Sequence, residues 1–256
     1  WRARSRGLWL LRQSMVLFLF GEGACALNYL VSMGGSDPLD LLHGLGMLGM
    51  GLLLPFGIAT IADERIVRYE APDATCAMQR FCGKCWKRDP VPCGLHRLFL
   101  FAAPAAAMVA LIPLSAPLLP IKPVVQVFDS HVVYAVTLPV QQIHFRLYPL
   151  LGAAAFLVSL LLLTGGRRTF AWAQRAFFAG VGFTFFSAFK FFLFYVFRHA
   201  PWWADFWEEV TELMTVAAVL VGLYVFRRQL GVFGFLDRWF GKGAPRGQAE
   251  AGDAAD

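Results

Sequence analysis

The chain has 256 residues, of which 58% are hydrophobic and only 16% are charged. Its mean hydropathy is +0.56, and it contains 25 phenylalanines, well above ordinary soluble usage. This composition excludes an ordinary soluble domain, which would need more polar surface. The net charge of +6 comes from Lys and Arg that flank apolar stretches, so we attribute it to membrane topology and expect no nucleic-acid partner.

Six stretches approach the roughly 20 apolar residues that cross the hydrocarbon core of a bilayer. Because every backbone polar group in lipid must be hydrogen-bonded internally, each stretch is expected to form a helix. The predicted fold is an all-α, polytopic membrane helical bundle of about six transmembrane helices, forming one domain over residues 1–240. The stretches are 15–33, 41–62, 98–119, 147–164, 176–197 and 210–226.

Lys and Arg near helix ends predict the orientation, because they are retained on the cytoplasmic side. The start of the chain, the loops 63–97 and 165–175, and the segment after residue 226 are basic, whereas the alternate loops carry mainly acidic residues. This pattern predicts a multi-pass protein of a bacterial-type inner membrane with both termini in the cytoplasm. Residues 241–256, rich in Gly, Ala and charge, are expected to be a disordered tail.

Four of the five cysteines lie in the predicted cytoplasmic loop 63–97: Cys76, Cys82, Cys85 and Cys93. Thiols stay reduced in the cytoplasm, so the cluster predicts a metal centre in preference to disulfides. Cys82 and Cys85 form a C-x-x-C pair that can grip one ion, and the other two cysteines complete a tetrahedral zinc site. The spacing also lies near that of plant-type iron–sulfur proteins. Zinc, an iron–sulfur cluster and an ordinary loop without metal are the three alternatives.

The histidines all lie at or near the predicted helix ends. Helix-borne imidazoles that face a bundle interior can hold a b-type haem, and single interfacial histidines without a ligand are the alternative. Met47 and Met50 lie one and two turns beyond His43, which also permits copper binding through soft thioether ligands. Core packing is the more ordinary role for both methionines. The five histidines are His43, His96, His131, His144 and His199.

Parts of the middle of the chain resemble the cytochrome b561 superfamily. His43-Gly44, followed by Gly-Leu-Leu-Leu-Pro-Phe-Gly at 51–57, is similar to the family's second helix, in which a haem histidine precedes a Leu-x-Pro-x-Gly run. Leu95-His96-Arg97 and Ser130-His131 resemble the positions of the next two histidines. The resemblance implies a haem b held by His43 and His131, with His96 as a further family position. It also implies electron transfer between a periplasmic or quinone partner, or another redox protein, and the cytoplasmic side.

Ionisable residues within the apolar stretches are a second signal of function. Glu22 lies in the middle of the first stretch and Lys190 in the fifth, and such residues are costly in lipid unless they face a partner or a cavity. We expect each to be the other's partner. Glu209 and Glu212, spaced i and i+3, share one face of the last helix. They are candidates for a proton or cation entry site, or for carboxylate metal ligands together with His199. We assign Glu208 to favourable charge at a helix N-terminus.

The sequence therefore predicts a haem-binding electron-transfer subunit with a cytoplasmic four-cysteine metal loop. A proton-coupled or metal-ion transporter that uses Glu22, Lys190 and Glu212 is the alternative from another class. A structural subunit that packs against other membrane subunits is the third. The chain lacks a catalytic-triad order, a phosphate loop and an HExxH motif, so a hydrolase is disfavoured, and the sequence does not decide whether the protein is an enzyme.

Overall fold

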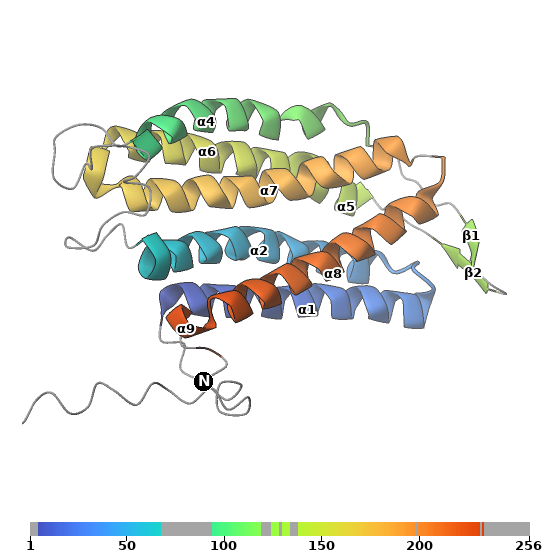
Figure 1. The fold of residues 1–256 in the computed structure, drawn as a ribbon. Helices are drawn as coiled ribbons and strands as arrows, with labels where there is room; N and C mark the ends of the chain where they lie inside the picture. Colours follow the sequence, from blue (N-terminus) through green and yellow to red (C-terminus); the bar gives the residue numbers. More distant parts are fainter. Residues whose placement is uncertain are drawn as a thin grey trace, which may run out of the picture. The chain divides into compact units, whose positions relative to one another are not determined.

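The computed structural model describes residues 5–67, 94–118, 124–127, 130–133, 138–197, 199–230 and 232. The chain divides into two compact units, residues 1–208 and 209–256, and each is described by itself. The described part of the first unit is a bundle of long helices (Figure 1), which confirms the predicted all-α fold class. Its long helices are α1 (Arg6–Ser32), α2 (Asp37–Ile61), α4 (Gly94–Ala110), α6 (Tyr148–Thr164) and α7 (Phe170–Val196).

The long helix α8 (Pro201–Val225) begins in the first unit and continues in the second, where α9 (Arg227–Leu230) follows it. Five described helices are long and apolar enough to cross a bilayer, and α8 is a further helix of 25 residues over the sixth predicted span. The prediction of a helical membrane protein of about six spans is therefore confirmed at the level of fold.

Short elements connect the long helices. The π-helical η1 (Ala62–Val67) continues α2, and the 3-10 helices η2 (Ile112–Ser115) and η4 (Gly166–Arg168) follow α4 and α6. Strands β1 (Val124–Val127) and β2 (Ser130–Val133) pair in an antiparallel hairpin. The helix α5 (Leu138–Gln142) and the π-helical η3 (Ile143–Leu147) then lead directly into α6.

The sequence placed the start of the fourth span too late. The apolar helix runs from Leu138 to Thr164, nine residues longer at its N-terminal end than predicted, and His144 and Arg146 lie inside it. Pro139 is accommodated in the first turn, where its missing N–H costs nothing. The guanidinium of Arg146 donates to the carbonyls of Phe145 and Ala116, both at 2.8 Å, so its charge does not interrupt the helix.

Polar side chains fix the turn between α1 and α2. Asn28 Oδ1 accepts hydrogen bonds from Ser32 Oγ at 2.5 Å and from the backbone N–H of Ser36 at 2.9 Å. Met33 and Gly34 adopt left-handed conformations with φ of 51° and 84°, which end α1 and reverse the chain. Asp37 lies in the first turn of α2, where the helix dipole favours an acidic residue.

Small residues allow α1, α2 and α7 to approach closely, as is usual in membrane bundles. A Cβ atom added to Gly46 of α2 would lie 2.7 Å from Gly21 Cα of α1, and one added to Gly57 would lie 3.0 Å from the Leu11 nitrogen. On the other side of α2, a Cβ on Gly182 of α7 would collide with the carbonyl oxygen of Gly51. The helix α2 therefore lies between α1 and α7 with glycine at both interfaces.

Aromatic and small apolar residues pack α7 against α6 and α4. One cluster joins Phe99, Leu163, Phe170 and Ala173, and a second joins Ala107, Ala110, Ala153 and Phe156. Large apolar side chains such as Leu30, Phe101 and Met108 are exposed, which suits helices surrounded by lipid.

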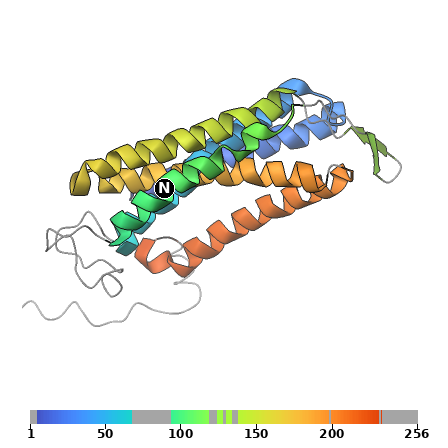
Figure 2. The ribbon, with the colours of Figure 1, turned by 90° about the horizontal axis from the view of Figure 1, so that it is seen from above.

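The basic ends of the helices gather at one end of the bundle. Figures 1 and 2 show the starts of α1, α4 and α7 and the ends of α2 and α6 at this end, with the β1–β2 hairpin beyond the opposite end. We call the first the basic end and the second the hairpin end. The arginines of the basic end are Arg6, Arg65, Arg97, Arg167, Arg168 and Arg175.

Candidate functional site: a buried polar cluster in the helical bundle

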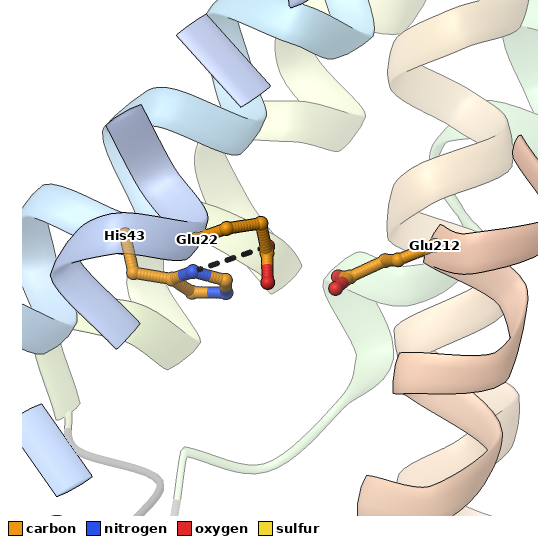
Figure 3. A group of neighbouring side chains, drawn as sticks. All are labelled: Glu22, His43 and Glu212. Atoms are coloured by element: carbon orange, nitrogen blue, oxygen red, sulfur yellow. Dashed lines mark ion pairs between the residues drawn. The ribbon is translucent and has the colours of Figure 1, made fainter. Parts of the chain in front are cut away.

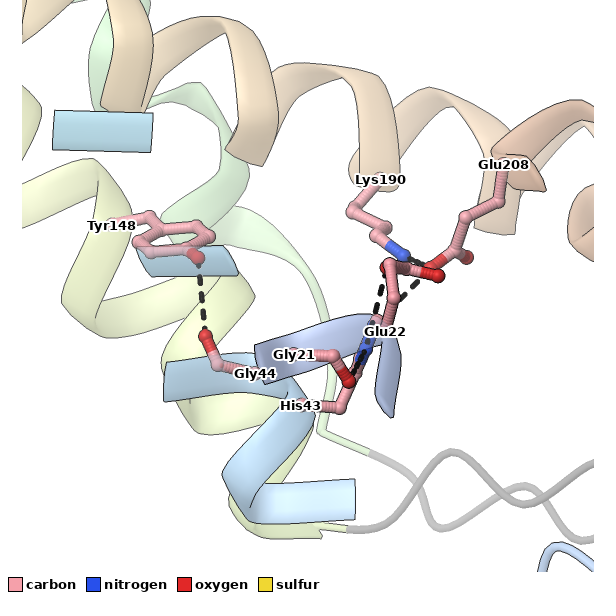
Figure 4. A network of polar contacts seen from close by, with 7 residues as sticks. All are labelled: Gly21, Glu22, His43, Gly44, Tyr148, Lys190 and Glu208. Atoms are coloured by element: carbon pink, nitrogen blue, oxygen red, sulfur yellow. Dashed lines mark hydrogen bonds and ion pairs between the residues drawn. The ribbon is translucent and has the colours of Figure 1, made fainter. Parts of the chain in front are cut away.

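Four ionisable side chains from four helices meet in the first unit (Figure 4). We call them the polar cluster: Glu22 of α1, His43 of α2, Lys190 of α7 and Glu208 at the start of α8. The exposed fractions of the His43, Lys190 and Glu208 side chains are 11%, 4% and 14%. All four residues lie in helices of bilayer-spanning length, so the cluster places several charges where water is scarce.

The glycine contact between α1 and α2 positions His43. Because Gly21 and Gly46 bring the two backbones together, His43 Nδ1 reaches the carbonyl oxygen of Gly21 at 3.1 Å. A carbonyl only accepts, so Nδ1 carries the proton and donates it. The same nitrogen lies 3.8 Å from Glu22 Oε1, and Figure 3 shows the carboxylate beside the ring.

The other ring nitrogen of His43 faces a second carboxylate. His43 Nε2 lies 3.9 Å from Glu208 Oε1, and the same oxygen forms an ion pair with Lys190 Nζ. In the neutral imidazole with a proton on Nδ1, Nε2 is an acceptor, as is the carboxylate. Two acceptors that face each other in a dry site gain from a proton or a cation between them.

The cluster contains one more carboxylate than ammonium group. Glu22 and Glu208 each carry a negative charge when ionised, and Lys190 supplies one positive charge. With His43 neutral, these four side chains therefore carry a net charge of −1 in the interior of the bundle. An unbalanced buried charge is costly, so the arrangement favours the uptake of one proton or one cation.

Next to the cluster lie Tyr148 of α6 and His144 of η3. The Tyr148 hydroxyl donates to the carbonyl of Gly44 at 3.4 Å, which ties α6 to the turn of α2 that carries His43 (Figure 4). The His144 and Tyr148 ring centroids are 5.5 Å apart. Ser187 Oγ of α7 donates to the His144 carbonyl at 2.6 Å and so holds the π-helical segment against α7.

A separate charged group lies at the basic end. Arg175 of α7 pairs with Asp63 of η1 at 3.5 Å, and both side chains are less than a tenth exposed. The guanidinium of Arg175 lies 5.0 Å from the Trp172 ring centroid, and that of Arg6 lies 5.2 Å from the same ring. These contacts join the starts of α1 and α7 to the end of α2, so we assign this group to helix assembly.

Both members of the predicted Glu22–Lys190 pair belong to the polar cluster. Lys190 forms an ion pair with Glu208 and Glu22 lies beside His43, and the direct pairing of Glu22 with Lys190 stays a prediction. Glu208 was therefore assigned too simple a role: it lies at the start of α8, yet its carboxylate contacts Lys190 and His43. The sequence gives no distance between residues 190 and 208, which are joined by a turn and belong to different helices.

The predicted haem histidines lie at different places. His43 is in the polar cluster, whereas His96 Nε2 hydrogen-bonds the carbonyl of Leu163 at 3.0 Å near the basic end. His131 is on strand β2, where it is paired with Gln126. Its side chain lies outside the described residues, so the pairing of His43 with His131 stays a prediction.

The structure says less about the other predicted site residues. Cys76, Cys82, Cys85 and Cys93 lie outside the described residues, as does the tail 241–256. Both ends of the predicted loop 63–97 are helical: residues 63–67 belong to η1 and residues 94–97 to α4. Glu209 and Glu212 lie on the part of α8 that belongs to the second unit. Met47 and Met50 are buried, as expected for core packing.

No family model, no curated protein and no solved structure matches the chain in the three comparisons made. The resemblance to the cytochrome b561 superfamily therefore stays a prediction, and the functional argument rests on the geometry of the bundle.

Proposed function

We propose that the protein is a proton-coupled cation transporter whose exchange site is the polar cluster. One observation carries the proposal: His43 Nε2 and Glu208 Oε1 face each other at 3.9 Å inside a bundle of bilayer-spanning helices. Ionisable groups at such a position are costly, and in membrane proteins they mark ion pathways and proton relays. A site with two facing acceptors and a net negative charge binds a proton or a cation, and only one of them at a time.

The exchange follows from the charges of the cluster. In the resting state a proton between His43 and Glu208 balances the second carboxylate, and Nδ1 keeps its bond to the Gly21 carbonyl. A cation that enters next to Glu22 and Glu208 repels this proton, because both are positive and occupy the same site. The proton leaves His43 Nε2 as the cation binds, and it returns when the cation leaves. Binding of one species therefore releases the other.

The ammonium group of Lys190 competes with an entering cation for the Glu208 carboxylate. Its ammonium pairs with Glu208 Oε1, which is also the oxygen nearest to His43 Nε2. While the site holds no cation, Lys190 keeps Glu208 ionised inside the bundle. When a cation binds Glu208, Lys190 loses part of this contact, so the fifth span responds to occupancy of the site.

Proton flux in proteoliposomes tests the proposal. The purified protein is reconstituted with a pH-sensitive dye inside the vesicles, and gradients of alkali and divalent metal ions are applied in turn. We expect at least one cation gradient to drive proton movement, and we expect E22Q, E208Q and K190M to lower the rate by at least about tenfold. Asp37, an exposed acidic residue at the hairpin end, supplies the control D37N, which should keep the wild-type rate. A wild-type protein that moves no protons under any gradient would overturn the proposal.

The location and topology are part of the proposal. The helices suit a lipid bilayer, and we assign the protein to a bacterial-type inner membrane with its basic end and both termini in the cytoplasm. The polar cluster then lies toward the periplasmic side, where an entering cation meets it first. Other membrane subunits are compatible with the exposed apolar faces.

The second candidate is the haem-binding electron-transfer subunit. It is favoured by the hydrogen bond from His43 Nδ1 to the Gly21 carbonyl. Many metal-binding histidines donate one ring N–H in this way, which orients the other nitrogen toward the metal. It is opposed by Glu208, which already faces Nε2. A reduced-minus-oxidised absorption spectrum separates the two candidates, because only a haem b gives a sharp reduced α-band that disappears in H43A and H131A.

The four-cysteine loop is a separate proposal. Cys76, Cys82, Cys85 and Cys93 would hold one zinc ion or an iron–sulfur cluster on the cytoplasmic side. In either case the loop has a structural or regulatory role beside the exchange site, since the loop and the cluster belong to opposite ends of the predicted topology.

A further inference from the structure

The starts of α4 and α7 and the end of α6 meet at the basic end, and we call this meeting point the three-helix joint. His96 Nε2 of α4 hydrogen-bonds the carbonyl oxygen of Leu163 of α6 at 3.0 Å. The His96 ring centroid lies 5.7 Å from that of Phe170 at the start of α7. Phe99, Leu163 and Phe170 belong to one buried apolar cluster. Because these buried contacts hold all three helix ends, the residues next to the joint lie on a rigid support.

Exposed arginines surround the three-helix joint. Arg97 directly follows His96 in α4. Arg167 and Arg168 lie in η4, the 3-10 turn that joins α6 to α7. All three arginines are exposed. The joint therefore presents three guanidinium groups at the surface of the bundle, from two different segments of the chain.

The basic end carries an excess of positive charge. Its described residues include the six arginines named above and two carboxylates, those of Asp63 and Glu64, so an excess of four positive charges remains however the groups pair. Every Lys or Arg described at this end is an arginine. The planar guanidinium of arginine binds phosphate through two parallel hydrogen bonds, which the ammonium of lysine does not offer. The charge and its chemistry fit an anionic partner that carries phosphate groups.

Exposed apolar side chains begin close to the arginines on the same helices. Leu98 and Phe101 of α4 are 59% and 80% exposed, and Phe101 lies about one turn beyond Arg97. Leu161 of α6 is 69% exposed and lies about two turns before Arg167. A phospholipid presents the same order of groups, with phosphate in the headgroup and acyl chains directly beneath it. A soluble phosphate compound would use the arginines and leave these apolar side chains without a partner.

We propose that Arg97, Arg167 and Arg168 form a docking surface for anionic phospholipids of the leaflet that the basic end faces. The guanidinium groups bind the headgroup phosphates, and the exposed apolar side chains of α4 and α6 contact the acyl chains. A lipid with a net negative charge is preferred to a zwitterionic one, because it meets an excess of positive charge. Binding is non-covalent and is independent of the chemistry of the polar cluster.

Lipid selectivity, measured by electron paramagnetic resonance, tests this inference. The full-length protein is reconstituted in phosphatidylcholine vesicles that contain a trace of spin-labelled phosphatidylglycerol or, in a parallel sample, spin-labelled phosphatidylcholine. The motionally restricted fraction of each probe gives the ratio of their association constants. We expect phosphatidylglycerol to be preferred by at least about threefold at low salt.

Single variants assign the preference to the three-helix joint. R97Q, R167Q and R168Q should each lower it, and the triple variant should abolish it, because the guanidinium groups that bind phosphate have been removed. Arg12, an exposed arginine of α1, supplies the matched control R12Q, which removes one positive charge away from the joint and should keep the parent's preference. Helix content, measured by circular dichroism, shows that each variant has folded.

Three outcomes would overturn the inference. The first is a parent protein that restricts both probes equally, which decides the matter whether or not the variants fold. The second is an equal loss in R12Q and in the three joint variants, because the preference then follows net charge and not this surface. The third is calorimetric binding of inorganic phosphate to the detergent-solubilised parent without any lipid preference, which would assign the arginines to a soluble anion. Proton flux through the polar cluster is a separate measurement, so the proposed function stands or fails independently.

Discussion

Replacing Lys190 by Met should strongly destabilise the bundle, because it leaves the Glu208 carboxylate buried without its ammonium partner. The two side chains are 4% and 14% exposed, so the pair is buried. Exposed ion pairs contribute about 0–1 kcal/mol, whereas removal of one partner from a buried pair costs about 3–5 kcal/mol. We expect K190M to lower the free energy of unfolding by the larger amount. The double variant K190M/E208Q should recover most of this loss, since no unpaired charge remains.

The assay is a double-mutant cycle in detergent micelles, with the free energy of unfolding obtained by denaturant titration of the parent, both single variants and the double variant. We expect a coupling energy of at least about 1.5 kcal/mol. Phe192, exposed on the same helix and two residues from Lys190, supplies the control F192L, which should stay within about 0.5 kcal/mol of the parent. Single variants that each lose less than about 0.5 kcal/mol, with additive effects, would refute the buried pair.

Three further predictions concern helix packing, topology and the cysteine loop. Gly46→Ala should lower the free energy of unfolding by about 1–3 kcal/mol, because its Cβ would lie 2.7 Å from Gly21 Cα. The control Gly23→Ala, whose Cβ meets nothing within 4 Å, should be neutral or stabilising. Equal losses in the two variants would contradict the close approach of α1 and α2. An impermeant thiol reagent should label Cys82 only after the cell membrane is permeabilised, and labelling of intact cells would reverse the proposed orientation. Changing Cys82 and Cys85 to Ser should remove the zinc or iron found by elemental analysis, and a parent protein with less than about a tenth of an equivalent would exclude the metal loop.

The sequence predicted the fold well because the bilayer imposes a simple rule. A spanning segment must be apolar and helical, so composition alone located the described helices α1, α2, α4, α6 and α7. The same rule says little about where a helix begins. The N-terminal part of the fourth span contains Pro139, His144 and Arg146, and only tertiary contacts, such as the bond from Arg146 to the Ala116 carbonyl, make these residues acceptable.

The site was predicted in part for a related reason. Glu22 and Lys190 stand out because a charge in an apolar stretch is rare, and His43 stands out through the family resemblance. Glu208 lies among acidic residues at a helix start, where a charge needs no explanation, so its contact with Lys190 has no local signal.

The close contact between α1 and α2 has a consequence for biosynthesis. Glu22 emerges from the ribosome long before Lys190 and Glu208, the other charges of the polar cluster, have been translated. A lone acidic side chain at the centre of a helix raises the cost of membrane insertion by about 2.5–3.5 kcal/mol. The first partner to arrive is His43, on the helix that follows directly and that packs through Gly21 and Gly46. Insertion of the two helices together, as a hairpin, brings His43 into the bilayer with Glu22. Lys190 and Glu208 then complete the polar cluster when the later helices insert.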